Sequence, residues 1–199
     1  MKILGISGSP NKEGNTAYAV NYALNIIKNE GLKTKYISLA GKKINPCIAC
    51  WKCEETHECY QNDDMKEIIE SMRWCEGMII GSPVYFGLIS GQLKVMMDRT
   101  IIFRPSYSSE MEMWGKIGAG IACAASRSGG QEVTLQNIHT FLMQHGMEVI
   151  NDGPSYSHSG GTIMKNAADD EWGLQTVRNL ALNMINIMKK EKKGGKYEC

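Results

Sequence analysis

Four cysteines lie close together in residues 47–59 of this 199-residue chain. Their spacing is C-x2-C-x2-C-x5-C, and they are Cys47, Cys50, Cys53 and Cys59. Thiolates at two-residue intervals can converge on one point, as the ligands of an iron–sulfur cluster or of a zinc ion must. Zinc sites usually pair two C-x2-C units across a longer gap, so this spacing favours a cluster. A zinc site, a redox dithiol and unliganded thiols remain as alternatives.

Charge and hydropathy exclude several classes of protein. The formal net charge is +1, so nothing indicates a nucleic-acid partner. No apolar run approaches the roughly 18 residues of a membrane span. The first ten residues lack the apolar core and cleavage site of a signal peptide. We therefore expect a cytoplasmic protein without a membrane partner, in a compartment where thiols stay reduced and clustered cysteines favour metal over disulfides.

Strand-like and helix-like stretches alternate along the whole chain. Apolar runs and alternation predict strands at 2–8, 34–39, 77–82, 116–124 and 148–150. Apolar stripes at helical spacing predict helices at 15–30, from 63 onward, 92–100, 132–144 and 172–190. This pattern predicts one α/β domain over residues 1–199, with a doubly wound five-stranded parallel sheet and a cysteine-rich loop at 47–59.

In such a sheet the ligand lies beyond the carboxyl ends of the strands, where the strand order reverses. Three loops rich in glycine and serine follow predicted strands, and they span residues 7–16, 82–87 and 126–131. The cysteine loop follows the second strand, so we expect it at the same edge of the sheet.

The loop at 7–16 leaves a strand and enters a helix. The N-terminus of a helix offers unpaired N–H groups and a positive dipole, which suit a phosphate. No lysine follows the second glycine as in a P-loop, because Asn15 stands there, and the loop is not G-x-G-x-x-G. A monophosphate held by neutral donors fits better than a nucleoside triphosphate. The candidate residues are Ser7, Ser9, Pro10, Asn15 and Thr16. The alternative is an ordinary, well-capped turn.

The other two loops suit a planar ring. In the loop at 82–87, Tyr85 and Phe86 offer flat apolar surface, and Gly87 permits close approach of the backbone. Backbone donors of such a loop can bond the polar edge of a ring. The candidate residues are Pro83, Val84, Tyr85, Phe86 and Gly87, followed in the third loop by Ser126, Arg127, Gly129 and Gly130. The alternatives are a turn whose aromatic residues belong to the core and a flexible loop.

These motifs resemble a known family. Ser7-Gly-Ser-Pro10, Gly14-Asn-Thr16, Ser82-Pro-Val-Tyr85, Gly91-Gln-Leu-Lys94 and Asp98-Arg99 look like the flavodoxin-like NAD(P)H-dependent FMN reductases. The cysteine run resembles one branch of that family, the iron–sulfur flavoproteins of methanogens and other anaerobes. The resemblance implies a flavodoxin-like fold, FMN, a 4Fe-4S cluster on the four cysteines, and a homodimer or homotetramer with FMN near a subunit interface.

The expected activity is that of an electron-transfer oxidoreductase. The resemblance implies that it takes single electrons from a donor such as ferredoxin and reduces oxygen species or a quinone. Asn11 stands where many relatives carry arginine, which removes a cation and leaves NAD(P)H an open question. The alternatives are a cluster-free NAD(P)H-dependent FMN or quinone reductase and a non-catalytic redox carrier or sensor. No acid–base residue is assigned.

Two further expectations concern residues outside the loops. Cys75 and Cys123 are interpreted as small core residues. The segment from Met96 to Trp114, which includes Met97 and Met113, is expected to be available for a subunit interface.

Overall fold

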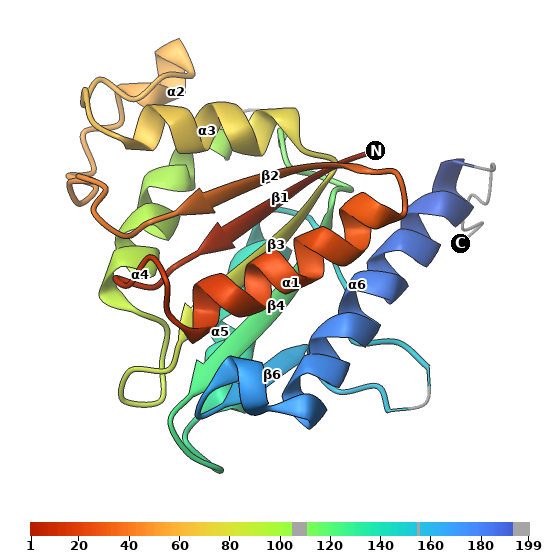
Figure 1. Ribbon diagram of the computed structural model, residues 1–199. Coiled ribbons are helices and arrows are strands. Elements are labelled where there is room, and N and C mark those ends of the chain that lie inside the picture. Colours follow the sequence, from red (N-terminus) through yellow and green to blue (C-terminus); the bar gives the residue numbers. More distant parts are fainter. Residues whose placement is uncertain (105–110, 155, 193–199) are drawn as a thin grey trace.

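The computed structural model describes residues 1–104, 111–154 and 156–192, which form a parallel β-sheet covered by helices on both faces (Figure 1). The strands follow the order β2-β1-β3-β4-β5, and every described pairing between named strands is parallel. The first four strands are β1 (Lys2–Ser7), β2 (Lys33–Ser38), β3 (Gly77–Pro83) and β4 (Ile117–Ala124). The predicted doubly wound α/β architecture is confirmed.

Two short strands share the fifth position of the sheet. β5 (Glu148–Val149) pairs with the beginning of β4, and β6 (Gly161–Met164) pairs with its end. Between them the chain leaves the sheet and returns. The sequence predicted β5 but not β6, because four residues are too few for an alternating pattern to be visible.

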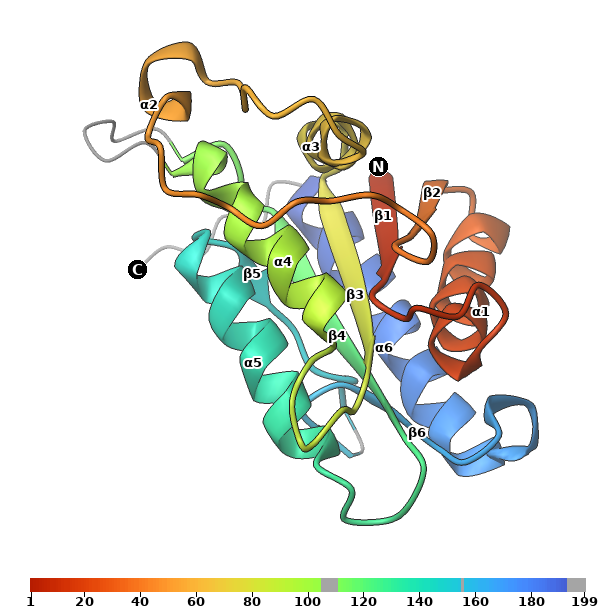
Figure 2. The same cartoon turned by 90° about the vertical axis from the view of Figure 1, so that its left-hand side faces the viewer.

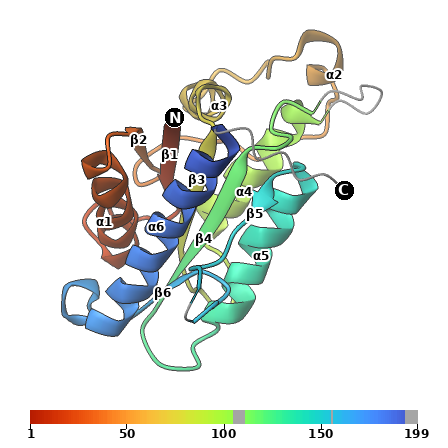
Figure 3. The same cartoon turned by 90° about the vertical axis from the view of Figure 1, so that its right-hand side faces the viewer.

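Helices cover the two faces of the sheet in separate layers (Figures 2 and 3). α1 (Asn15–Asn29) and α6 (Glu171–Lys192) lie on one face, and α3 (Met65–Trp74), α4 (Gly91–Arg99) and α5 (Gln131–Gln144) lie on the other. β3 and β4 are buried along nearly their whole length because both of their faces are covered. Shorter helical turns are α2 (Cys53–Thr56), η1 (Thr100–Phe103) and η2 (Ala167–Asp169). Among the described helices, none is long and apolar enough to cross a membrane.

The methionines that we expected at an interface belong to the core instead. Met96, Met97 and Met113 are buried among the side chains beneath α3, α4 and α5. Their spacing on the chain is that of the buried face of α4 and its continuation, which sequence alone does not distinguish from an exposed apolar face. Trp114 is exposed, and residues 105–110 of the same segment lie outside the described residues. Cys75 and Cys123 are buried, as predicted.

Candidate functional site

The three glycine- and serine-rich loops lie side by side at the carboxyl edge of the sheet. They follow β1, β3 and β4, which are neighbours, and the strand order reverses between β1 and β3. The Gly8 N–H donates to the Gly81 carbonyl at 2.8 Å, and the Ser90 hydroxyl donates to the Gly8 carbonyl at 2.5 Å. The Val84 N–H donates to the Cys123 carbonyl at 2.8 Å. The sheet therefore brings the predicted loops together and ties the first to the second.

Polar side chains of the loop at 7–16 suit a phosphate group. Ser7 is fully buried, and its Oγ finds no hydrogen-bond partner among the described residues. Ser9 Oγ accepts from the Asn11 N–H at 3.1 Å, which leaves its own hydroxyl hydrogen to donate. Thr16 is also buried, with its hydroxyl beside the weakly donating thiol of Cys123. No side chain in the described part of the chain caps the N-terminus of α1, so its first N–H groups remain for an anion.

Asn15 has a structural partner that the sequence did not suggest. Its Oδ1 accepts from the Ala167 N–H at 2.9 Å, and its Nδ2 donates to the Lys165 carbonyl. The amide therefore ties the start of α1 to the segment after β6, and this segment brings the exposed Lys165 to the same edge of the sheet. Pro10 is exposed at the outer side of the loop. Because β6 was not predicted, nothing in the sequence indicated this neighbour.

The loop at 82–87 presents its aromatic residues to solvent. The Tyr85 N–H and the Leu88 carbonyl lie 2.9 Å apart, and the reverse pair lies 3.1 Å apart, which closes a two-residue hairpin turn. Both turn residues are left-handed, with φ of 51° at Phe86 and 80° at Gly87. Phe86 is completely exposed and Tyr85 is half-exposed. The alternative in which these aromatic residues form core is therefore excluded, and flat apolar surface is available at the site.

The third loop is closed by Gln131, a residue that we had not assigned to the site. Its Oε1 accepts from the Gly129 N–H at 3.0 Å, and its Nε2 donates to the Ser126 carbonyl at 3.1 Å. Gly130 has φ of +106°, and a Cβ placed there would lie 2.6 Å from the Cα of Gly87. The second and third loops thus touch backbone to backbone, and only glycine permits this approach. The predicted Arg127 is exposed on the same loop.

The four clustered cysteines line one pocket of about 290 Å³. Cys47 and Cys50 are exposed, and Cys53 and Cys59 are half-buried. Burial raises the pKa of the Cys53 thiol, and the three other thiols raise it further. In the described part of the chain, no three cysteine, histidine or acidic side chains are gathered closely enough to hold a metal ion. Four thiols are the donor set of an iron–sulfur cluster or of a structural zinc ion. In this structure they are neighbours without being gathered on one point.

The cysteine pocket lies at the far end of α4, not at the carboxyl edge of the sheet. It is lined by the end of α4 and by η1, whereas Ser90, the residue before α4, donates to the Gly8 carbonyl in the loop at 7–16. Figure 2 shows α2, which begins at Cys53, near the end of α4 that is farther from this loop. The 9 residues of α4 place about 13 Å of helix between the two sites. Our expectation of a shared edge was wrong, because the segment between β2 and α3 is long enough to run back along the molecule.

A buried ion pair holds together the two ends of residues 45–63, the cysteine segment. Arg99 Nη1 donates to Asp63 Oδ2 and to the Asn45 carbonyl, both at 2.7 Å, and the Asn45 N–H donates to Asp63 Oδ2 at 3.0 Å. Burial alone would raise the pKa of Asp63, but these donors hold it below its ordinary value. Arg99 Nη2 also donates to Cys59 Sγ at 3.2 Å. The sequence showed both residues but gave no sign of their pairing.

Residues 1–162 match the family model described as NADPH-dependent FMN reductase. The chain belongs to this family. It is 45% identical to an iron-sulfur flavoprotein of Methanocaldococcus jannaschii, over 97% of this chain and 100% of that protein. It is 38% identical to an iron-sulfur flavoprotein of Methanosarcina thermophila, over 94% of this chain and 95% of that protein. The solved structure of a flavodoxin from the domain Archaea has a TM-score of 0.63 at 17% identity, covering 95% of this chain and 99% of that one.

These relatives confirm the predicted resemblance and the flavodoxin-like fold. This member of the FMN reductase family is a flavin-dependent oxidoreductase, and the family match supports FMN as its flavin. The orphaned Ser7 hydroxyl, the uncapped start of α1 and the exposed aromatic turn are features that fit such a cofactor.

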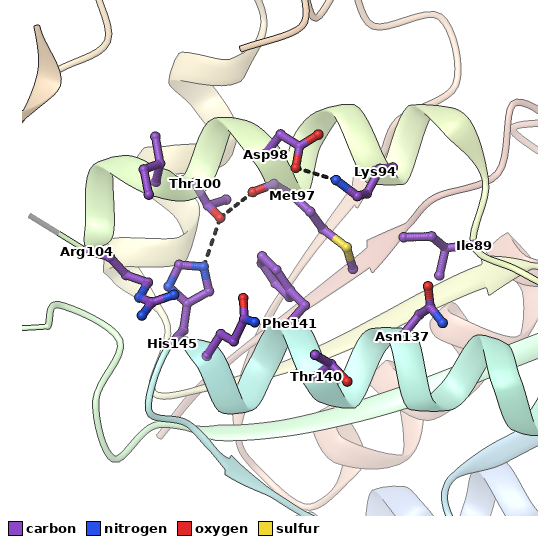
Figure 4. A pocket seen from close by; sticks show the side chains of 12 residues that line it. Ile89, Lys94, Met97, Asp98, Thr100, Arg104, Asn137, Thr140, Phe141 and His145 are labelled. Carbon is purple, nitrogen blue, oxygen red and sulfur yellow. Dashed lines mark hydrogen bonds and ion pairs between the residues drawn. The ribbon is translucent and has the colours of Figure 1, made fainter. Parts of the chain in front are cut away.

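This FMN reductase family member has a further cavity, of about 390 Å³, between α4 and α5 (Figure 4). His145 is buried at one end of it, with Nε2 2.9 Å from Thr100 Oγ1. Because Thr100 donates its hydroxyl to the Met97 carbonyl at 2.6 Å, its oxygen accepts from His145. This assigns the imidazole proton to Nε2.

His145 should make the stability of the protein depend on pH. Burial, aided by the charge of Arg104, lowers its pKa to about 4, against about 6.5 in the unfolded chain. Between these values the unfolded state binds the proton and the folded state does not, so the stabilisation is present above pH 6.5 and is lost as the pH falls towards 4. The loss is on the order of 3 kcal/mol. Urea unfolding of His145→Gln at pH 7 and pH 5 should show a smaller difference in unfolding free energy than wild type shows. Equal pH dependence in wild type and His145→Gln would contradict the assignment.

Proposed function

We propose that this flavin-dependent oxidoreductase binds FMN at the three loops of the carboxyl edge and a 4Fe-4S cluster at Cys47, Cys50, Cys53 and Cys59. One observation carries the proposal: the four thiols line a single pocket in a chain that matches iron-sulfur flavoproteins over nearly its whole length. The residues around that pocket include Ile48 and Trp51, whose apolar surface can limit the access of water to bound sulfur.

The proposed activity combines one-electron and two-electron chemistry. A cluster passes one electron at a time and a flavin accepts one or two, so the loaded protein can collect two single electrons and pass both to one acceptor. The polypeptide would bind and orient the two groups: the hydroxyls of Ser7, Ser9 and Thr16 would hold the phosphate, and the loops around Gly87 and Gly130 would hold the ring. We propose a one-electron protein donor of the ferredoxin class, and oxygen species or a quinone as acceptor, with NAD(P)H as the alternative donor.

Composition analysis of anaerobically purified protein tests this assignment. We expect FMN by mass analysis of the released flavin, together with about four iron and four sulfide per chain. Zinc without sulfide would favour the zinc alternative, and release of FAD would contradict the phosphate assignment. Protein that lacks metal but oxidises NADPH rapidly would instead indicate a cluster-free FMN or quinone reductase.

We further propose that the protein works as a homodimer or homotetramer. Within one chain, α4 separates the FMN loops from the cysteines. Exposed apolar side chains lie at both places, namely Phe86 at the loops and Ile48, Trp51 and Tyr60 around the cysteines. A second copy could cover these surfaces and bring one site closer to the other. Sedimentation that shows a monomer with full FMN occupancy would contradict this proposal.

Replacing Thr16 by alanine should weaken FMN binding by about 1–2 kcal/mol, a factor of roughly 5–30 in Kd, the scale of one hydrogen bond to a charged group. Titration of apoprotein with FMN, followed by quenching of flavin fluorescence, measures the change. Thr176→Ala is the matched control, since Thr176 is equally buried but bonds the Gly173 carbonyl at the start of α6. An unchanged Kd for Thr16→Ala would remove this residue from the site.

A further inference from the structure

Arg99 presents a buried cation to one of the clustered thiols. Its side chain is 1% exposed, and that of its partner Asp63 is 4% exposed. Nη2 lies 3.2 Å from Cys59 Sγ and 3.2 Å from Asp63 Oδ1, so one of its N–H groups donates to the sulfur and the other to the carboxylate. The planar fork of the guanidinium fixes the direction of both bonds. Asp63 therefore anchors the cation, and the cation faces the sulfur.

We propose that Arg99 is a positioning residue that raises the reduction potential of the iron–sulfur cluster through its hydrogen bond to Cys59. The inference rests on the proposed function, because it requires Cys59 to be a cluster ligand. Reduction adds negative charge to a cluster and its thiolates, and a cation that donates to a ligand sulfur stabilises that charge. Because the pair is buried, salt in the buffer screens this interaction far less than it screens a surface pair.

The ion pair also joins the two ends of the cysteine segment. Asn45 lies just before Cys47, Asp63 lies just after Cys59, and Arg99 bonds both. The guanidinium is thus held by the Asn45 carbonyl and the Asp63 carboxylate, and not by the backbone of any of the four cysteines. We expect its position beside Cys59 to be set by the fold of the chain, so that the N–H donor is already in place when the cluster is assembled.

A second arginine at the same segment provides a matched control. Arg73 Nη2 donates to the His57 carbonyl at 2.9 Å, and the guanidinium makes two further bonds to Glu112, at 2.7 and 3.0 Å. Arg73 therefore contacts the cysteine segment and carries the same charge, but its hydrogen bonds go to the His57 carbonyl and to Glu112 and not to a sulfur. Arg73→Gln removes a charge and a segment contact without removing a hydrogen bond to a cluster ligand.

The test compares Arg99→Gln with Arg73→Gln in anaerobically purified, cluster-loaded protein. Iron and sulfide are measured first, and the midpoint potential of the cluster is then determined by redox titration monitored by EPR. We expect reduction of the cluster in Arg99→Gln to be about tenfold less favourable at a given ambient potential, a shift of about 59 mV to lower potential for one electron. Arg73→Gln should keep the wild-type potential.

Arg99→Gln leaves Asp63 buried without its cation, which can itself damage the fold. The double variant Arg99→Gln/Asp63→Asn replaces the ion pair with two neutral amides. Its potential should lie below that of wild type but above that of Arg99→Gln, because the negative charge of Asp63 is removed together with the cation. A wild-type potential in the fully loaded double variant would overturn the inference. Loss of iron and sulfide from both Arg99→Gln and the double variant, while Arg73→Gln stays loaded, would also overturn it. Arg99 would then have a purely structural role. Wild-type protein without iron and sulfide would instead overturn the proposed function itself, and this inference with it.

Discussion

Serine in place of any one of Cys47, Cys50, Cys53 or Cys59 is expected to remove or degrade the iron–sulfur cluster while FMN stays bound. Clusters are held by thiolates, for which a serine hydroxyl is a poor substitute. FMN should remain because the loops proposed to bind it lie at the other end of α4 from the cysteine pocket. Iron, sulfide and flavin are measured on the same anaerobic samples, together with the rate of reduction by a one-electron donor, which should fall sharply.

The buried cysteines supply the controls for this experiment. Burial raises the pKa of Cys75 to about 11 and that of Cys123 to about 12, so both are neutral thiols at pH 7 and unsuited to bind metal. Cys75→Ser keeps the donor that Cys75 Sγ offers to the Met72 carbonyl at 3.2 Å, and Cys123→Ala removes a thiol beside Thr16. Both variants should retain full iron and sulfide. A normal cluster in Cys59→Ser would refute the four-ligand assignment.

The elements that were predicted correctly from the sequence are those whose own residues show a clear pattern of apolar side chains. β3 and β4 are long apolar runs, and α1 and α5 carry apolar stripes that face the sheet, so each element is visible without its neighbours. The position of the three loops followed from one rule, namely that parallel strands end at a common edge. β6 was missed because its four residues form a strand only by pairing with the end of β4.

The contacts that shape the site depend on residues far apart in the chain, and for that reason they were not predictable. Asn15 reaches Lys165 and Ala167 across the sheet edge, and Arg99 reaches Asp63 at the base of the cysteine segment. The sequence alone also did not decide whether Phe86 belongs to the core or to the surface. Its side chain is exposed because Phe86 and Gly87 form a turn with two left-handed residues.

The cysteine pocket is an exception to the rule that segments following parallel strands lie at the carboxyl edge of the sheet. This rule holds for short connections, but the connection between β2 and α3 is long and spans residues 39–64. A connection of that length is not confined to the end of its strand, and its course is set by where it is anchored. Here the anchor is Arg99, the last residue of α4, which holds the segment away from the three loops at the carboxyl edge.

Replacing Gly130 by alanine is expected to weaken FMN binding by about 3 kcal/mol, or roughly a hundredfold in Kd, if the displaced loops lose two hydrogen bonds to the flavin. The added Cβ would lie 2.6 Å from the Cα of Gly87, and backbone cannot rotate away as the end of a flexible side chain can. The two loops must therefore separate. Titration of apoprotein with FMN by fluorescence quenching measures the effect, and urea unfolding gives the stability of each variant.

Strain at a left-handed residue must be distinguished from displacement of the loops, and Gly31 makes this possible. Its φ is +84°, and no atom of the described structure outside its own neighbours lies within 4 Å of a Cβ built there. Alanine at either position pays about 1–2 kcal/mol of backbone strain, so both variants should lose stability. Only Gly130→Ala should lose affinity for FMN, because only its Cβ meets another loop. Equal affinity in the two variants would show that the contact between Gly130 and Gly87 does not shape the flavin site.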